Sequence, residues 1–423
     1  MIRIYRLGDM SEQEIFSRAE IRANVESTVS AIVEDIRKRG DEALIEYTLR
    51  FDGAALDSLR VSQEEIDAAF EQVDKEMIGV LQRAAENIRA FHTRQVRNSF
   101  ILNDKPGVVM GQKVVPIERV GLYVPGGTAA YPSTVLMDAI PAKIAGCGKI
   151  VMTTPAGRDG KIRPVILAAA SVAGVDEIYK IGGAQAIAAL AYGTQSVPRV
   201  DKIVGPGNAY VAEAKRQVYG QVSIDMIAGP SEILIVADGA ANPAHVAADM
   251  LSQAEHDKMA TAVLVTPSMA LAQGVAAELE KQLPLLERED IARASIENNG
   301  KIIISGDLKE AIDASNRLAP EHLELCVDDP FDYLDQVKNA GSIFLGRHCP
   351  EALGDYFAGP NHTLPTGGTA RFSSPLSVDD FVKKMQYTYF TGGALQSVAQ
   401  DVARFAREEG LTGHARSVLI RGK

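Results

Sequence analysis

The chain has 423 residues, 46% hydrophobic and 23% charged, so it can form two or three domains with well-buried cores and is not composed like a disordered protein. Its 44 basic and 55 acidic residues give a net charge of −11, the wrong sign for a protein that coats nucleic acid. Three cysteines without a Cys-x-x-Cys pair exclude a disulfide framework and a thiolate zinc cage, and fit a reducing cytoplasm. No apolar segment follows the N-terminal Met1-Ile-Arg-Ile-Tyr-Arg6 and no run of about 18 apolar residues occurs, so neither a signal peptide nor a membrane span is expected.

The first 110 residues are predicted to be mainly helical. Two capping boxes, Ser11-x-x-Glu14 and Ser62-x-x-Glu65, predict two long helices, the second running toward Phe91. From Ile117 onward, short β-branched runs alternate with Ala-rich runs, which is typical of a parallel sheet with helices on both faces. Strands are expected at 120–124, 150–153, 177–181 and 202–204, and helices at 135–145, 165–172, 184–191 and 208–219.

A second α/β round follows the Gly/Pro-rich segment Ile227-Ala-Gly-Pro-Ser-Glu232, which is interpreted as a crossing point between two units. Beyond Gly346 the chain is irregular and polar to about Ser377. The elements expected here are strands at 233–236, 262–265 and 302–305, and helices at 242–255, from 269, at 308–318, at 378–386 and at 394–409.

Three Gly-rich turns follow predicted strands, where the strand ends and helix N-termini of a parallel sheet bind ligands. No Gly-x-Gly-x-x-Gly fingerprint and no P-loop occurs, so a dinucleotide would be held in an atypical way. The alternative is that these glycines only make tight turns. The turns are Tyr123-Val-Pro-Gly-Gly127, Ile181-Gly-Gly-Ala-Gln185 and Val204-Gly-Pro-Gly-Asn-Ala-Tyr210.

The C-terminal half carries candidate metal and proton-transfer residues. Gln253 and His256 lie three residues apart, so on a helix they share a face and could share a metal, although such a pair is usually solvated surface. Glu321 beside His322 could transfer protons near neutral pH, or could be a dipeptide at a solvated strand edge. Cys326 could be a thiol nucleophile, or an inert buried residue between Leu325 and Val327.

Together these stretches resemble the histidinol dehydrogenase family over nearly the whole chain. The resemblance is carried by motifs in the right order and spacing: Gly121-Leu-Tyr-Val-Pro-Gly-Gly127, Gly205-Pro-Gly-Asn-Ala-Tyr-Val211, Gly229-Pro-Ser-Glu232, Leu251-Ser-Gln-Ala-Glu-His-Asp257, Ala319-Pro-Glu-His-Leu323, Pro350-Glu-Ala-Leu-Gly-Asp-Tyr-Phe-Ala-Gly-Pro-Asn-His362 and Glu408-Glu-Gly-Leu-Thr-Gly-His414.

The resemblance implies an α/β fold with two incomplete Rossmann-like domains, of aldehyde-dehydrogenase-like architecture, and a homodimer that shares its active sites. An N-terminal arm, 1–21, and a C-terminal tail, 377–423, would be exchanged between subunits. The first domain would comprise 22–122 with 232–376 and carry the metal and catalytic residues. The NAD-binding domain would comprise 123–231.

The family's site residues fall on matching positions of this chain. One zinc ion per subunit would be bound by Gln253, His256, Asp355 and His414, with His414 and Glu409 coming from the partner chain. Nitrogen and oxygen donors of this kind suit zinc with open positions for a substrate. Contacts to NAD+ fall on Tyr123, Gln185 and Asn208, and substrate contacts on Ser231, Gln253, His256, His322, Asp355, His362, Glu409 and His414.

The reaction implied is a four-electron oxidation of L-histidinol to L-histidine through bound histidinal, which consumes two NAD+. The enzyme would be cytoplasmic. His322 would accept the alcohol proton, and Glu321 would activate water to hydrate the aldehyde. Three alternatives stay open. The chain could be a relative that oxidises another small polar alcohol, such as a sulfonated diol, or a non-catalytic binding module. It could also be a metal-dependent hydrolase, although the motif His-Glu-x-x-His is absent.

Overall fold

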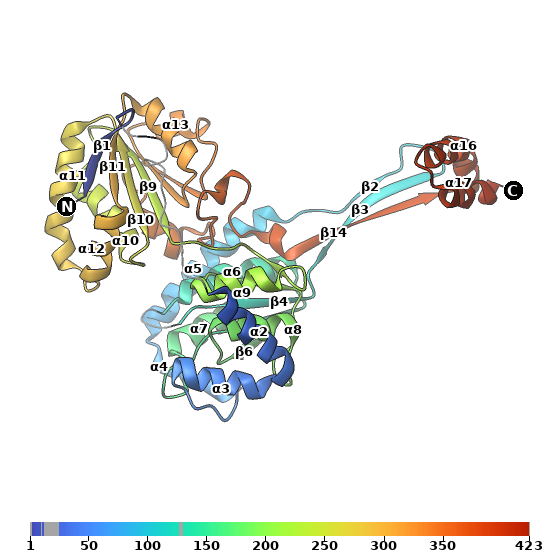
Figure 1. The fold of residues 1–423 in the computed structure, drawn as a ribbon, viewed down its shortest axis with the longest axis horizontal. Coiled ribbons are helices and arrows are strands. Elements are labelled where there is room, and N and C mark those ends of the chain that lie inside the picture. The colour runs from blue at the N-terminus through green and yellow to red at the C-terminus, as the bar shows by residue number, and fades with distance from the viewer. Residues whose placement is uncertain (1, 10, 12–24, 127–129, 423) are drawn as a thin grey trace. The chain divides into compact units, whose positions relative to one another are not determined.

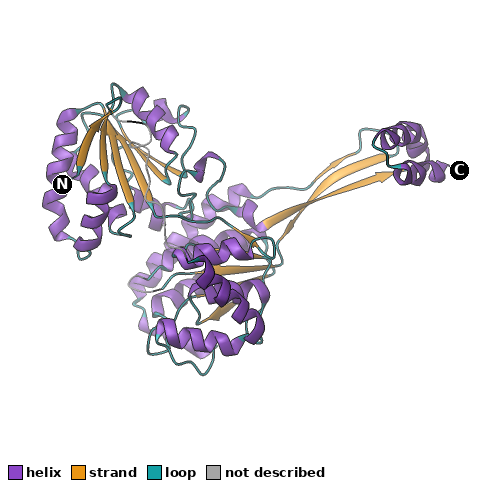
Figure 2. Cartoon of the chain, in the orientation of Figure 1, coloured by secondary structure: helices purple, strands orange, loops and turns teal. Residues whose placement is uncertain are grey.

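The computed structural model describes residues 2–9, 11, 25–126 and 130–422, and the helix predicted from Ser11 falls outside these ranges. The chain divides into two compact units, Met1–Gln95 with Glu118–Phe381, and Val96–Ile117 with Val382–Lys423. The first holds two parallel sheets, and the second holds an antiparallel sheet and two helices (Figure 2). The predicted mixed α/β class with parallel sheets is therefore confirmed. Within the described ranges, no helix is long and apolar enough to cross a bilayer.

The larger parallel sheet has six strands in the order β1-β11-β10-β9-β12-β13. Arg3–Arg6, which the sequence analysis assigns to a terminal arm, forms β1 and pairs with β11 of the same chain. The other strands follow the second predicted α/β round. They are β9 (Glu232–Ala237), β10 (Thr261–Thr266), β11 (Lys301–Ile304), β12 (His322–Cys326) and β13 (Ser342–Leu345).

Helices cover both faces of this sheet (Figure 1). Along β9, Ile233 and Ile235 join the core cluster of α10, α11 and α12, whereas Leu234 and Val236 join that of α13. Successive strand side chains point to opposite faces, which explains why the sequence of β9 is a continuous apolar run. The helices are α10 (Pro243–Ala254), α11 (Met269–Gln282), α12 (Glu289–Asn299) and α13 (Leu308–Leu318), with short helices α14 (Phe331–Leu334) and α15 (Glu351–Leu353) and a π-helical turn η3 (Gly354–Ala358).

The smaller parallel sheet has five strands in the order β6-β5-β4-β7-β8. Its strands and helices follow the first predicted α/β round. The strands are β4 (Arg119–Tyr123), β5 (Lys149–Thr153), β6 (Glu177–Tyr179), β7 (Lys202–Val204) and β8 (Ser223–Ile224), and the helices are α6 (Pro132–Ala145), α7 (Pro164–Ala173), α8 (Gly183–Tyr192) and α9 (Ala209–Val218).

The N-terminal helices α2 (Glu26–Arg39) and α3 (Asp41–Asp52) share a hydrophobic core with α8 and α9 of the smaller sheet. This differs from the expected boundaries, which grouped 22–122 with the larger sheet. The stripe of Val29, Ile32, Val33 and Ile36 on α2 marks a buried face. Such a stripe shows that a helix packs, but it does not show against which element.

The helix predicted to run from Ser62 toward Phe91 is instead two helices, so that prediction is wrong in its extent. The Ser62 capping box is confirmed, but α4 (Gln63–Gln72) ends before Asp74. The side chain of Asp74 accepts a hydrogen bond of 2.8 Å from Met77 N and starts α5 (Lys75–His92). A second N-cap inside a periodic stretch is thus enough to divide it.

The second unit contains the antiparallel strands β2 (Phe100–Leu102), β3 (Val108–Pro116) and β14 (Val382–Phe390), followed by α16 (Gly392–Glu408) and α17 (Thr412–Leu419). The helix predicted at 378–386 is wrong beyond Phe381, because β14 pairs with β3 along its whole length. The run Tyr387-Thr-Tyr-Phe390 has strong β propensity, and this pairing satisfies its backbone groups. Ala403, Ala406 and Ala415 form the core between the two helices.

Candidate active site and metal centre

His322 opens β12, an interior strand of the larger sheet, and Glu321 immediately precedes it. Ala319 ends α13 with a φ of 50°, and Pro320 follows, so the chain turns sharply into the strand. Glu321 and His322 are both buried. The alternative interpretation of a solvated strand edge is therefore wrong, because β9 and β13 flank β12 and helices cover the sheet.

Two hydrogen bonds to Glu232 fix this pair. The Glu321 Oε2 atom accepts a bond of 2.9 Å from Glu232 N, and His322 Nδ1 lies 3.0 Å from the backbone oxygen of Glu232. A carbonyl oxygen only accepts, so Nδ1 carries the proton and Nε2 of the neutral ring is the basic atom. Nε2 is buried and has no hydrogen-bond partner among the described residues.

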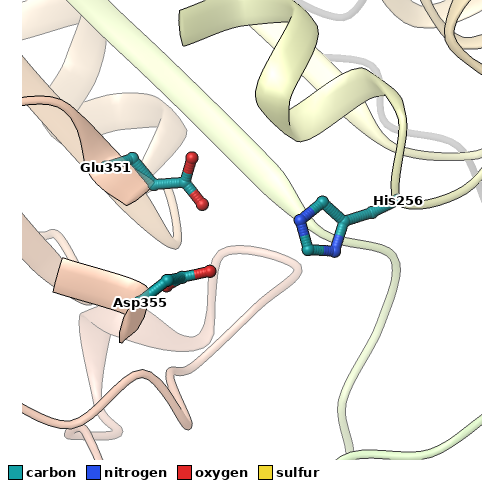
Figure 3. A group of neighbouring side chains, drawn as sticks. All are labelled: His256, Glu351 and Asp355. Atoms are coloured by element: carbon teal, nitrogen blue, oxygen red, sulfur yellow. The ribbon is translucent and has the colours of Figure 1, made fainter. Parts of the chain in front are cut away.

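Three ligand-bearing side chains gather beside His322. His256, Glu351 and Asp355 each offer a donor atom, and these atoms lie within 4.8 Å of one another (Figure 3). His322 Nε2 lies 3.6 Å from Asp355 Oδ1 and 4.0 Å from Glu351 Oε1. The structure thus brings the predicted metal residues His256 and Asp355 together with the predicted base.

Gln253 lies in the last turn of α10, three residues before His256, and is 1% exposed. Its Oε1 atom is buried without a hydrogen-bond partner in the described part of the chain. A buried oxygen in this state costs about 1–3 kcal/mol, and a cation would remove that penalty. One imidazole nitrogen with amide and carboxylate oxygens fits a zinc-type site rather than a thiolate cage.

The charges at this site perturb its titrating groups. Burial raises the pKa of Glu321 to about 8 and that of Glu351 to about 7. Burial lowers the pKa of His322, but the surrounding carboxylates, Glu321 first, outweigh it and raise it to about 10. A divalent cation held by these carboxylates would oppose that rise and favour the neutral ring. Burial also opposes ionisation of Asp355, yet His322 and His362 hold its pKa at about 2. Such perturbed groups in one cluster are characteristic of functional sites.

The remaining predicted substrate contacts in the first unit are Ser231 and His362. Ser231 immediately precedes β9, and its backbone oxygen accepts a bond of 2.9 Å from Thr261 N. His362 Nδ1 lies 2.9 Å from the backbone oxygen of Asp355, and its Nε2 lies 3.2 Å from Thr134 Oγ1. His362 thus connects the Asp355 segment to α6.

Glu409 and His414 belong to the second unit. Glu409 is the residue that ends α16, and His414 lies in α17. Both side chains are exposed. Their predicted contribution to a partner's site stays a prediction.

The predicted cofactor residues lie after strands of the smaller sheet. Tyr123 ends β4, and its hydroxyl accepts a bond of 3.1 Å from Gly183 N. Gln185 is buried in the first turn of α8, and Asn208 caps α9 by accepting bonds from Tyr210 N and Val211 N. The carboxyl ends of neighbouring parallel strands share one edge, so these residues surround the expected ligand edge.

A cleft of about 710 Å³ lies at the same edge, beside the ends of β4 and β5. This volume is typical of a ligand site. Apolar, cationic and acidic side chains line it, among them Phe51, Pro125, Arg158, Lys161, Asp52 and Asp159. Sequence reasoning missed this cleft because its residues come from separate stretches of the chain.

Glu351 is the site residue that the sequence analysis did not assign. It stands in the motif beginning at Pro350, four residues before Asp355, and is 2% exposed. The four-residue spacing between Glu351 and Asp355 was the available signal in the sequence. Such a spacing places two carboxylates on the same side of the backbone only when the segment is helical. The segment is helical in the structure, whereas the sequence predicted an irregular one.

Cys326 ends β12 as a buried thiol whose Sγ lies 3.8 Å from Glu324 Oε2. Burial raises its pKa well above the ordinary value, and the nearby carboxylates of Glu324 and Asp249 add to that shift. The thiolate is the nucleophilic form, so the thiol-nucleophile alternative is disfavoured and the inert buried interpretation is favoured.

Known proteins match over nearly the whole chain. The family model described as histidinol dehydrogenase matches residues 17–422. Histidinol dehydrogenase of Geobacter sulfurreducens is 56% identical over 96% of this chain and 95% of its own. That of Clostridium acetobutylicum is 52% identical over 100% of this chain and 99% of its own. The solved structure of histidinol dehydrogenase from Elizabethkingia anophelis has a TM-score of 0.95 and 41% identity, covering 99% of this chain and 98% of that chain.

Proposed function

The chain belongs to the histidinol dehydrogenase family, and we propose that it oxidises L-histidinol to L-histidine through bound histidinal in the last two steps of histidine biosynthesis. The observation that carries this proposal is the unpartnered Nε2 of His322, which lies 3.6 Å from Asp355 in a cluster of metal-type donors. A buried base beside such donors is what oxidation of a chelating amino alcohol requires. We place this reaction in the cytoplasm.

The first oxidation needs a proton acceptor at the alcohol oxygen. His322 Nε2 would accept that proton, and NAD+, when bound, would supply the hydride acceptor for the carbinol carbon, so that the products are histidinal and NADH. The Nδ1 proton stays on the ring, held by the Glu232 backbone oxygen at 3.0 Å. That bond keeps the ring oriented with its basic nitrogen toward the site.

The second oxidation needs water at the aldehyde carbon. Glu321 accepts a proton from that water as its oxygen adds to the carbonyl, and His322 then accepts a hydroxyl proton as the second hydride leaves. Overall, one histidinol, two NAD+ and one water give one histidine carboxylate, two NADH and three protons. The backbone N–H of Glu232 orients the Glu321 carboxylate, with an N···O distance of 2.9 Å.

One zinc ion per subunit would be held by Gln253, His256 and Asp355 of the first unit. The fourth ligand would be His414 of the partner subunit. When bound, the ion supplies Lewis-acid polarisation and an anchor for the imidazole and amine nitrogens of the substrate. The orphaned Gln253 Oε1 supports this assignment. Ser231 and His362 would complete the substrate contacts within the first unit.

For NAD+, we propose that Tyr123, Gln185 and Asn208 bind the cofactor at the carboxyl edge of the smaller sheet. The adjoining cleft of about 710 Å³ would take the rest of the dinucleotide, with Arg158 and Lys161 facing its phosphates. The N-terminal end of α8 adds favourable partial charge there. This arrangement explains how a chain without the Gly-x-Gly-x-x-Gly fingerprint binds a dinucleotide.

The decisive experiment incubates zinc-loaded protein with L-histidinol and NAD+. Two NADH per histidine are expected, and absence of turnover with the metal fully loaded would overturn the proposal. Profiling other small polar alcohols, a sulfonated diol included, tests the related-dehydrogenase alternative. In that case another alcohol would be oxidised with a higher kcat/KM than histidinol.

We also propose a homodimer in which the tail, 377–423, brings Glu409 and His414 to the partner's site. Chains carrying His322→Asn and His414→Asn are each expected to be inactive alone. Mixing them under subunit exchange should restore part of the activity, since one site of a mixed dimer is then intact. No recovery would favour a site formed by one chain.

A further inference from the structure

The interior of α6 carries a buried carboxyl group that the reaction described above does not use. Asp138 is 0% exposed and stands in a run of buried apolar residues, with 135–137 before it and 139–140 after it. Burying a carboxyl group in such surroundings is unfavourable unless it forms compensating interactions. A leucine at this position would pack without that cost, so the contacts of Asp138 must explain why a carboxyl group stands here.

One oxygen of this carboxyl group holds the segment that contains the proposed substrate contact His362. Thr363 Oγ1 donates a hydrogen bond of 3.0 Å to Asp138 Oδ1. One turn earlier on α6, Thr134 Oγ1 lies 3.2 Å from His362 Nε2, and the side chain of Asn361 donates a bond of 2.7 Å to a backbone oxygen of the same helix. Three consecutive residues of the segment are therefore fixed to one helix.

The other oxygen faces the third Gly-rich turn, which leads from β7 to the proposed cofactor contact Asn208. Gly205 opens this turn with a φ of 112°, and a Cβ atom added there would lie 3.0 Å from Asp138 Oδ2. The same Cβ would overlap the backbone oxygen of Tyr123, so only glycine lets the turn pass this closely. Asp138 Oδ2 is buried and has no hydrogen-bond partner among the residues that the structure describes. Asp138 thus lies between the substrate segment and the cofactor turn.

The charges around the turn favour a neutral Asp138. Lys215 Nζ, which is paired with Asp225, donates a bond of 2.8 Å to Gly205 O, and Asp225 Oδ2 accepts one of 2.8 Å from Gly205 N. This ion pair connects the turn to α9. Burial raises the pKa of Asp138 well above its ordinary value, and the negative charge of Asp225 adds to that rise. A neutral carboxyl group can still accept from Thr363 through Oδ1, and it adds no second negative charge beside Asp225.

We propose that Asp138 is a positioning residue for hydride transfer, because it fixes the substrate segment, 361–363, and the cofactor turn, 205–208, against the same helix. This inference rests on the proposed function, which assigns His362 to the substrate and Asn208 to NAD+. A hydride passes only when the two reacting carbons lie about 3–3.5 Å apart, and a displacement of about 1 Å can cost about 100-fold in rate. Asp138 acts through these two segments and needs no contact with either ligand.

The test measures the rate constant of the first hydride transfer rather than the amount of active protein. Metal-loaded enzyme in excess over L-histidinol is mixed rapidly with saturating NAD+, and the first phase of NADH formation is followed. Thr363→Val removes the hydroxyl at nearly constant volume, so we expect this rate constant to fall at least about 10-fold, which corresponds to a displacement smaller than about 1 Å. Thr363→Ser should stay within about threefold of wild type, because it keeps the hydrogen bond.

Thr48→Val is the matched control. Thr48 is buried in α3, and its hydroxyl has no hydrogen-bond partner within the described ranges, so the rate constant of this variant should equal that of wild type. Asp138→Asn keeps the shape and the acceptor of the neutral group and should retain most of the rate, whereas Asp138→Leu should lose as much as Thr363→Val. The double variant Asp138→Leu, Thr363→Val should be no slower than either single variant, because both changes break the same link.

The outcomes distinguish positioning from a purely structural role. A structural role lowers the amplitude of the NADH phase or the free energy of unfolding but leaves the rate constant unchanged, and that result in folded Thr363→Val would overturn the inference. Losses that multiply in the double variant would also overturn it, since the two residues would then act separately. If Asp138→Leu does not fold, the two Thr363 variants decide the question. Failure of the wild type to form NADH from histidinol would instead overturn the proposed function.

Discussion

The backbone oxygen of Glu232 lies 3.0 Å from Nδ1 of His322 and fixes which nitrogen of the ring carries its proton. Glu232 opens β9, and its own N–H binds the Glu321 carboxylate. One residue of a neighbouring strand thus orients both proton-transferring groups. Because the contacts come from the backbone, side-chain substitution at Glu232 would not remove them.

His322→Asn should remove the base while leaving the fold intact. The Asn amide can still donate to the Glu232 oxygen, but it has no basic nitrogen. We expect kcat to fall by about 10²–10⁴-fold, the usual contribution of a positioned acid or base. Steady-state NADH formation measures the loss, with circular dichroism as the control for folding. A folded variant with near-normal turnover would remove His322 from the reaction.

Glu321→Gln should separate the two oxidations. The Gln oxygen can still accept from Glu232 N, so His322 stays in place, but activation of water for the aldehyde is lost. We expect oxidation of histidinal to fall about 10²–10⁴-fold, while the first hydride transfer falls far less. Rapid mixing with NAD+ should then show a burst of one NADH per site and little histidine. Equal loss of both steps would contradict the assigned role.

Cys326→Ser should leave turnover within about threefold of wild type. The thiol is buried and its raised pKa keeps it protonated, so it supplies no nucleophile. Glu324 Oε2, which lies 3.8 Å from Sγ, can accept from the introduced hydroxyl. The rate of NADH formation measures turnover, and the histidine yield per NADH shows whether the second oxidation is completed. Collapse of the second oxidation step would restore the thiol-nucleophile mechanism.

A buried ion pair supports the third Gly-rich turn. Lys215 Nζ pairs with Asp225 and donates a bond of 2.8 Å to Gly205 O, while Gly205 N donates one of 2.8 Å to Asp225 Oδ2. Lys215→Met leaves the carboxylate buried without its partner, so we expect a loss of about 3–5 kcal/mol in the free energy of unfolding.

Denaturant unfolding measures that loss, and the double variant Lys215→Met, Asp225→Leu should lose less than the sum of the two single variants. Because Gly205 opens the turn that leads to Asn208, the KM for NAD+ should rise more than the KM for histidinol. Additive stabilities would show that the two residues do not act as a pair.

How far the sequence determines these features depends on the range of the interaction. The βα alternation and the capping residues are local, and they predicted the parallel strands and the cap at Ser62 correctly. The packing partner of α2 is not local, because its apolar stripe is compatible with either sheet. The strand at 382–390 exists through pairing with β3, a segment about 270 residues away.

The site shows the same division. Short sequence motifs contain the site residues Glu321, His322, Gln253 and His256, and the resemblance to a family indicated their roles. Glu351 needed the structure, since its position beside His322 depends on the turn at 351–358 and on Ser252 of another helix. The cleft beside β4 likewise collects residues from stretches that no single motif spans.

The stability of the fold should depend on pH through Asp52, the last residue of α3. Its Oδ2 atom is buried without a partner within the described ranges, and burial raises its pKa to about 6 from the ordinary value of 3.8. Between these two values the folded state binds more protons than the unfolded state, so the contribution of Asp52 to stability declines as pH rises from about 4 to about 6. Asp52→Asn removes the ionisation, and the free energy of unfolding of this variant relative to wild type should therefore be higher at pH 7 than at pH 4.

Urea unfolding at both pH values measures the difference, with Glu287→Gln as the exposed control that should show none. A difference independent of pH would mean that Asp52 ionises equally in both states.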